Sequence, residues 1–133
     1  MSTERTKLEQ GRAAFAFKCA EEGARLEKKK EYLSYVRKIP MQIKTNGLGA
    51  AMAFAFAKGS KNGTPQKDKA WGLLYHHVEQ WLKVDPKQLI QFNDNRLAAK
   101  LTEEKSVTYR AVTVEVLAFL SWLKRFSEGL IDE

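Results

Sequence analysis

The sequence contains few of the residues with which small proteins form covalent or metal cross-links. It has one cysteine and two histidines among 133 residues. Cys19 cannot form a disulfide within the chain, and no HExxH motif or cysteine pair provides the usual spacing of zinc ligands. A domain of this size buries about two-thirds of its unfolded surface, so it folds without such devices. A disulfide-stapled scaffold and a zinc finger are therefore excluded.

Long hydrophobic runs are absent as well. No stretch of 18 apolar residues occurs, and the opening residues MSTERTKLEQ are polar and charged, unlike a secretory signal. We therefore expect a soluble, cytoplasmic protein.

Acidic residues are too few to balance the basic ones, and the excess of positive charge lies in the first half of the chain. Residues 1–69 hold 15 Lys and Arg against 7 Asp and Glu, a net charge of +8, whereas residues 70–133 hold 8 against 9, a net charge of −1. This asymmetry favours an anionic partner, most commonly nucleic acid, although a solvated basic face without a partner explains it equally well.

Apolar residues recur at helical spacing along most of the chain, which predicts an all-α fold. We expect residues 1–133 to form a single domain, a compact helical bundle of five to six helices. The predicted segments are a long helix from the capping box Thr6-Lys7-Leu8-Glu9, a short helix over 32–38, an apolar helix over 48–57, an amphipathic helix ending at Asp85-Pro86, one or two short helices over 87–101, and a final helix over 105–128.

Proline and glycine predict where these helices end. Pro40 is expected to stop the second helix, and Lys44-Thr45-Asn46-Gly47 to form a cationic turn. Gly59 to Pro65 is predicted to be a flexible loop in which Thr64-Pro65 starts the next helix. Gly129 is predicted to cap the final helix.

Residues that could support catalysis do not form a recognisable constellation. His76 and His77 are adjacent, so on a helix they point about 100° apart, which favours a partly exposed structural role over metal binding. Cys19 lies on an apolar face, where its thiol is inert. We therefore expect no enzymatic activity, cofactor or metal. A metal-dependent nuclease using His76, His77 and Asp94 is the least favoured alternative.

Two further predictions concern buried side chains. Trp71, Trp81, Phe54 and Phe56 fall at core spacing, so they are interpreted as core residues rather than base-stacking platforms. Glu115 lies within the apolar surface of the final helix and is predicted to pair with an arginine or lysine, because an unpaired buried carboxylate is costly.

Three segments together resemble a known family. They are YVRKIPMQIKTNGLGAAMAFAFAKG (35–59), WGLLYHHVEQWL (71–82) and YRAVTVEVLAFLSWLKRFSEGL (109–130). In this order they resemble the small helical subunit of the type III-B CRISPR RNA-guided effector, the Cmr complex, from about Leu8 to Leu130. The chain departs from the family pattern at Ala50 and Ala51, where polar residues are frequent, and at Ser121, where Asn is common.

The resemblance implies a noncatalytic, all-helical subunit. It implies partners too: copies of itself, the repeated backbone subunit, and the guide RNA and target RNA whose channel its basic face lines. The residues that match the family's recurring positions are Arg37, Lys38, Lys44, Asn46, Tyr109, Arg110, Trp122, Lys124 and Arg125.

Phosphate contacts from basic residues are independent of sequence, which suits a protein that must accept any guide and target. An alternative is a protein-interaction scaffold whose basic face binds acidic partner subunits rather than RNA. The polar face of the first helix, with Arg5, Arg12, Lys18 and Arg25, is expected to be mainly solvated and secondarily a binding face. The candidate nucleic-acid-binding residues are Lys18, Arg37, Lys38, Lys44, Asn46, Arg110, Lys124 and Arg125.

Overall fold

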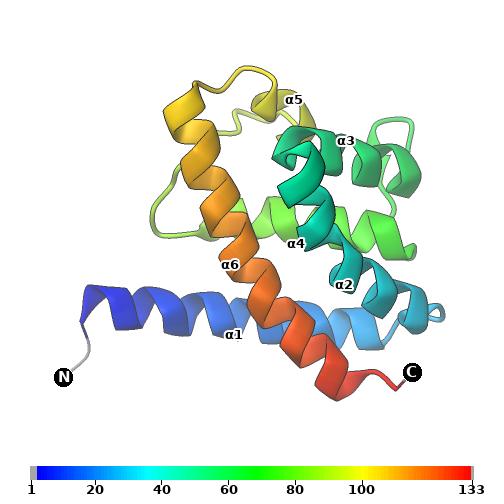
Figure 1. Cartoon of the computed structure of the whole chain (residues 1–133). Helices are drawn as coiled ribbons and strands as arrows, with labels where there is room; N and C mark the ends of the chain where they lie inside the picture. Colours follow the sequence, from blue (N-terminus) through cyan, green and yellow to red (C-terminus); the bar gives the residue numbers. More distant parts are fainter. Residues whose placement is uncertain (1–2, 133) are drawn as a thin grey trace.

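The structure is a computed structural model that describes residues 3–132. Within these residues the chain forms six α-helices and one small β-hairpin (Figure 1). The predicted all-α bundle of five to six helices is confirmed. The elements are α1 (Glu4–Ala24), α2 (Lys29–Asn46), α3 (Leu48–Gly59), β1 (Ser60–Lys61), β2 (Thr64–Pro65), α4 (Ala70–Val84), α5 (Leu97–Leu101) and α6 (Ser106–Leu130).

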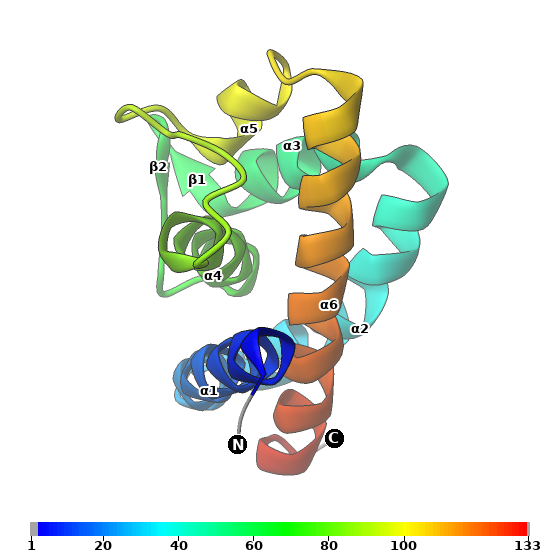
Figure 2. The ribbon, with the colours of Figure 1, turned by 90° about the vertical axis from the view of Figure 1, so that its left-hand side faces the viewer.

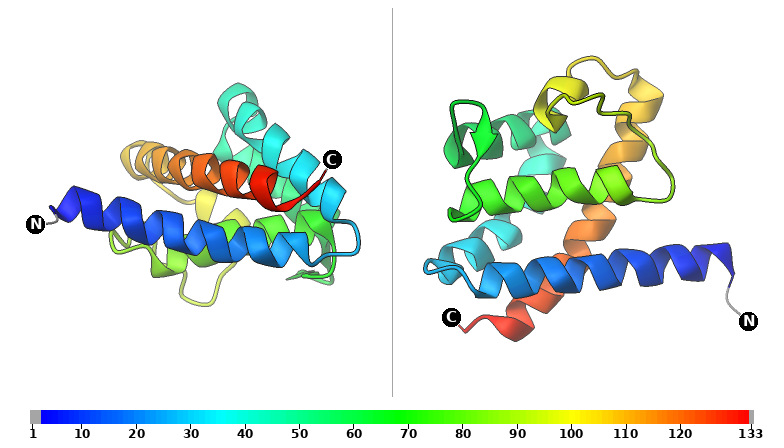
Figure 3. Two further views of the ribbon diagram at one scale, coloured as in Figure 1. Left: turned by 90° about the horizontal axis from the view of Figure 1, so that it is seen from below. Right: turned by 180° about the vertical axis from the view of Figure 1, so that it is seen from behind.

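Helix α6 organises the arrangement, because it crosses α1 and lies beside α2, which runs in the opposite direction (Figures 1 and 2). Two polar contacts join α6 to α2 and to the start of α3. The Arg37 Nε donates to the Glu128 carboxylate at 2.9 Å, and the Gly49 N–H donates to the Tyr109 hydroxyl at 2.6 Å. Helix α4 lies between α1 and α3 (Figure 3).

The core fills the space between these helices. Trp81 of α4 stacks on Phe119 of α6 with ring centroids 5.9 Å apart, and Phe15 of α1 packs against both rings. The largest fully buried side chains are Tyr32, Tyr75, Phe119, Leu33, Ile39, Leu48, Met52, Leu74, Leu82, Leu97, Leu120 and Leu123. Among the described residues no helix is both long and apolar enough to span a membrane.

The first helix begins earlier than its capping box predicts. Thr3 is the N-cap, and its hydroxyl accepts a hydrogen bond from the Thr6 N–H at 3.1 Å. Thr6 therefore lies inside the first turn and does not cap it.

Pro40 does not end α2, so this prediction was wrong. The helix continues to Asn46, and the chain turns only at Gly47, whose φ of 92° suits glycine. An internal proline costs about 3 kcal/mol or more. Val36, Ile39 and Ile43, on both sides of it, are at most 2% exposed, and each buried side chain contributes about 1.5–3 kcal/mol. Packing of this apolar face therefore outweighs the local cost.

The segment predicted to be a flexible loop contains the hairpin. Ser60 pairs with Pro65 and Lys61 with Thr64, while Asn62 and Gly63 both have positive φ at the turn. Asn-Gly is the sequence that a tight two-residue hairpin turn favours. Thr64-Pro65 therefore belongs to a strand, and α4 begins five residues later than Pro65, at Ala70.

The remaining differences lie in the C-terminal half. Only 97–101 is helical between Asp85 and α6, and the predicted interruption is present as two left-handed residues, Asn93 and Asp94. Helix α6 runs to Leu130, so Gly129 is inside the helix and does not cap it.

Candidate nucleic-acid interface

Helix α2 presents four of the predicted RNA-contact residues to solvent. Arg37, Lys38, Lys44 and Asn46 are all exposed. Residues seven apart share one helix face, so Arg37 and Lys44 project from the same side of α2. Met41, between them on that side, is 65% exposed. This side of α2 is therefore open to solvent at Met41, while Arg37 reaches Glu128 of α6.

Helix α6 adds three more exposed basic residues beside α2. Arg110 follows Tyr109, whose hydroxyl contacts Gly49 just beyond the end of α2. Lys124 and Arg125 lie one turn before Glu128, which pairs with Arg37. The two neighbouring helices thus carry seven predicted residues, which we call the α2–α6 basic surface: Arg37, Lys38, Lys44, Asn46, Arg110, Lys124 and Arg125.

Lys18, the eighth predicted residue, lies elsewhere. It is exposed on the flank of α1 that faces α4, where it lines a pocket with Trp81, Val84 and Pro86. The opposite flank of α1 carries Phe17, which contacts Phe126 of α6. The structure therefore separates Lys18 from the α2–α6 basic surface.

Sequence reasoning missed Lys30 as a member of the basic face of α2. A pocket of about 360 Å³ is lined by Lys30, Ser34, Arg37 and Lys38, with Leu33 as its apolar side chain. The spacing of Lys30, Arg37 and Lys44 by seven residues is the signal that was available. The prediction of a second helix over 32–38 that stops at Pro40 left Lys30 and Lys44 outside that helix, so their alignment was missed.

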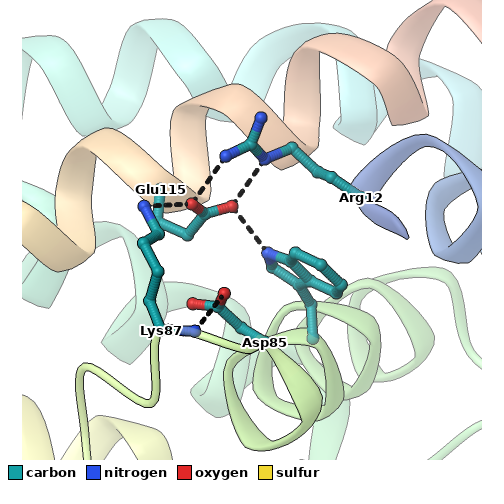
Figure 4. Close-up of polar contacts among 5 residues, drawn as sticks. Arg12, Asp85, Lys87 and Glu115 are labelled. Carbon is teal, nitrogen blue, oxygen red and sulfur yellow. Dashed lines mark hydrogen bonds and ion pairs between the residues drawn. The ribbon is translucent and has the colours of Figure 1, made fainter. Parts of the chain in front are cut away.

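A buried ion pair joins α1 to α6. The Glu115 carboxylate, which is fully buried, accepts two hydrogen bonds from Arg12, at 2.6 and 2.8 Å, and one from the Trp81 indole at 2.9 Å (Figure 4). The Lys87 ammonium lies 2.5 Å from the same carboxylate. The predicted pairing of Glu115 is confirmed. Arg12, expected on a solvated face, is instead 8% exposed.

The two carboxyl groups of this cluster have opposite pKa shifts. Burial raises the pKa of Glu115, but hydrogen bonds from Arg12, Lys87 and Trp81 outweigh burial and lower the pKa below its usual value. Burial raises the pKa of Asp85. One of its carboxylate oxygens accepts a hydrogen bond from the Lys87 backbone N–H, and the other has no partner among the described residues. The surroundings therefore favour the ionised form of Glu115 and disfavour that of Asp85.

His77 is more buried than predicted. His77 is 2% exposed; its Nδ1 lies 2.7 Å from the Tyr32 hydroxyl and its Nε2 2.6 Å from the Glu22 carboxylate. Because a carboxylate only accepts, Nε2 carries the hydrogen, and Nδ1 of the neutral ring accepts from Tyr32. No group of three or more His, Cys, Asp or Glu residues within 3–132 could hold a metal ion.

This arrangement predicts that stability falls below neutral pH. Burial lowers the pKa of His77 below 6.5, although the hydrogen bond to Glu22 opposes the shift. The unfolded chain therefore takes up a proton first as the pH falls through about 6.5, and stability decreases by up to about 1.4 kcal/mol per pH unit. Urea unfolding at pH 7.5, 6.5 and 5.5 measures this slope.

The His77→Gln variant is the control for the pH dependence. It removes the titrating ring, so its free energy of unfolding should vary less between pH 7.5 and 5.5 than that of the unmodified chain. An identical slope in both proteins would show that another group causes the change.

Comparisons with known proteins show which family the chain is similar to. Residues 8–130 match the model of the CRISPR-associated protein family Cas_Cmr5. A Thermus thermophilus protein named CRISPR system Cmr subunit Cmr5 is 31% identical over 119 residues, which cover 89% of this chain and 90% of that protein. The crystal structure of a CRISPR-associated Cmr5 family protein from the same organism superposes with a TM-score of 0.71 at 28% identity, covering 92% of this chain and 99% of that one. The chain belongs to the Cas_Cmr5 family of CRISPR-associated proteins.

Proposed function

We propose that this chain is a noncatalytic structural subunit of a type III-B CRISPR RNA-guided effector complex, and that it functions as a single helical domain. Its partners in the complex are the repeated backbone subunit, copies of itself, and the guide and target RNA. Membership of the Cas_Cmr5 family supports this role, as does the similarity to a Thermus thermophilus protein named as a Cmr subunit.

The observation that carries the proposal is the α2–α6 basic surface, in which two adjacent helices carry exposed basic side chains. Lysine and arginine contact phosphates without reading bases. Such a surface accepts any guide and target and leaves sequence recognition to base pairing. Each lost phosphate contact is expected to reduce the salt dependence of binding by about 0.7 log units per tenfold change in salt for a single strand.

Charge reversal on the two helices tests the surface. We expect the triple variant Lys38→Glu, Lys44→Glu, Lys124→Glu to bind a fluorescein-labelled single-stranded RNA at least about tenfold more weakly, because three phosphate contacts are replaced by repulsion. Fluorescence anisotropy measures the affinity, and circular dichroism shows that the helices are retained. Arg37 is left unchanged because its ion pair with Glu128 also has a structural role.

Two single variants serve as controls for this experiment. Lys61→Glu changes an exposed residue of the hairpin, and Lys18→Glu changes the residue on the far flank of α1. Both should bind RNA nearly as well as the unmodified chain. If the triple variant keeps its RNA affinity but no longer co-purifies with the other subunits, the surface binds acidic partner subunits instead.

A further inference from the structure

Two aromatic residues that sequence spacing assigned to the core are partly exposed. Phe54 is 42% exposed and Trp71 is half-buried. Tyr35 of α2 stacks on Trp71 of α4 with ring centroids 4.2 Å apart and planes at 10°, and Phe54 of α3 meets Trp71 edge-on at 5.3 Å. Three helices therefore contribute to an aromatic cluster that is partly open to solvent.

Tyr35 and Trp71 border a pocket of about 480 Å³, a volume within the range of small-molecule sites. Its charged lining is balanced. Lys58 also lies over Phe54, with its ammonium 5.7 Å from the ring centroid. The charged residues of the lining are Lys28, Lys58 and Lys69 with Glu27, Glu31 and Asp68.

The equal number of acidic and basic residues favours an uncharged ligand in this pocket. An anion in the pocket would meet three carboxylates, and a cation would meet three ammonium groups. An uncharged planar group avoids both conflicts, packs against the aromatic rings, and finds donors in the lysines and acceptors in the carboxylates for the polar atoms on its edge. A nucleobase has these properties, and base–aromatic stacking is how proteins hold unpaired bases without reading their sequence.

The neighbouring part of α2 is basic, so it could bind the sugar-phosphate backbone attached to such a base. The pocket lined by Lys30, Ser34, Arg37 and Lys38 contains three cations and a hydroxyl and no acidic residue. The two pockets lie along the N-terminal half of the same helix, one lined by residues 30–38 and the other by residues 27–35 of the α1–α2 turn and α2. The pocket with a net positive charge therefore suits a phosphate, and the aromatic pocket with balanced charges suits a base.

We infer that the pocket beside Tyr35 and Trp71 holds one unpaired base of single-stranded RNA. This inference rests on the RNA-binding role proposed above and adds a base contact to it. Removing the stacking ring lowers affinity for RNA that carries bases, while affinity for an abasic strand with the same phosphates is unchanged.

Trp71→Leu in the full chain tests the inference with two RNA probes of equal length, a uridine oligomer and its abasic counterpart. We expect the dissociation constant for the uridine oligomer to rise about tenfold and that for the abasic oligomer to stay constant. Trp71→Phe, which keeps a stacking ring, should restore most of the affinity. Equal melting temperatures would show that the variants are folded.

Intrinsic fluorescence gives a second readout. The chain has three tryptophans, of which Trp81 is buried in the core. In a Trp122→Phe background, the emission of the half-buried Trp71 should be quenched by the uridine oligomer and not by the abasic oligomer.

The outcomes separate the two proposals. If the chain binds both oligomers equally, and Trp71→Leu changes neither affinity, the base pocket is wrong while the α2–α6 surface stands. If Trp71→Leu keeps its RNA affinity but loses co-purifying subunits, the pocket binds a protein side chain and the inference is overturned. If no RNA binds the unmodified chain, the RNA-binding role fails and this inference with it.

Discussion

Replacing Glu115 by alanine is expected to lower the free energy of unfolding by about 3–5 kcal/mol. The substitution removes the acceptor for two Arg12 hydrogen bonds and for the Trp81 indole, and it leaves the guanidinium, 8% exposed, without its counter-charge. A loss of this size is a large fraction of the roughly 5–15 kcal/mol that stabilises a typical domain. Urea unfolding monitored by circular dichroism measures it.

Glu128→Ala is the matched control, since it removes a second carboxylate of the same helix from an arginine pair. The side chains of Arg37 and Glu128 are 37% and 35% exposed, so water and salt screen their attraction. We expect a loss of less than about 1 kcal/mol. Similar losses for the two variants would mean that burial does not determine the strength of the Glu115 pair.

Alanine at Gly72 is expected to destabilise the protein by about 3 kcal/mol, the upper end of the range for overpacking. A Cβ at this position would overlap the backbone carbonyl oxygens of Gln66 and Gly59, and a Cβ at Gly59 would overlap the backbone of Gly72. Backbone atoms cannot move aside as a flexible side chain does, so α3 and α4 would have to separate. Thermal unfolding of Gly72→Ala and Gly59→Ala measures the effect.

Alanine at Gly11 is expected to raise the stability of the protein rather than lower it. Gly11 lies within α1, and apart from its chain neighbours and the adjacent backbone of its own helix no heavy atom of the described residues is within 4 Å of the position that its Cβ would occupy. Alanine should stabilise the helix by about 0.5–1 kcal/mol. If the Gly72→Ala and Gly11→Ala variants had the same melting temperature, α3 and α4 would not approach each other as closely as the structure shows.

Local sequence patterns predicted elements well where one helix face is clearly apolar. The stripe from Trp71 to Leu82 predicted α4, and Asp85-Pro86 marked its end correctly. The same reasoning failed at Pro40, because the local cost of proline was weighed without the burial of Val36 and Ile43 around it. Only packing against the rest of the chain supplies that compensation.

The candidate site was predictable in part for a similar reason. Helical spacing aligns Lys30, Arg37 and Lys44 once α2 is known to be continuous. Whether a polar face is covered depends on distant segments, so spacing alone could not show that Lys18 faces α4. It also could not show that Trp71, despite its core spacing, reaches the surface.

The sequence by itself determined the helical class, the location of the positive charge in the first half of the chain, the need of Glu115 for a cationic partner, and the resemblance to the Cmr small subunit. Only the tertiary structure decided that this partner is Arg12, 103 residues away, and that α2 and α6 lie side by side. Periodicity specifies which face of a helix is apolar, because it depends on neighbours within a few residues. Which other helix covers that face depends on packing between segments far apart in the chain.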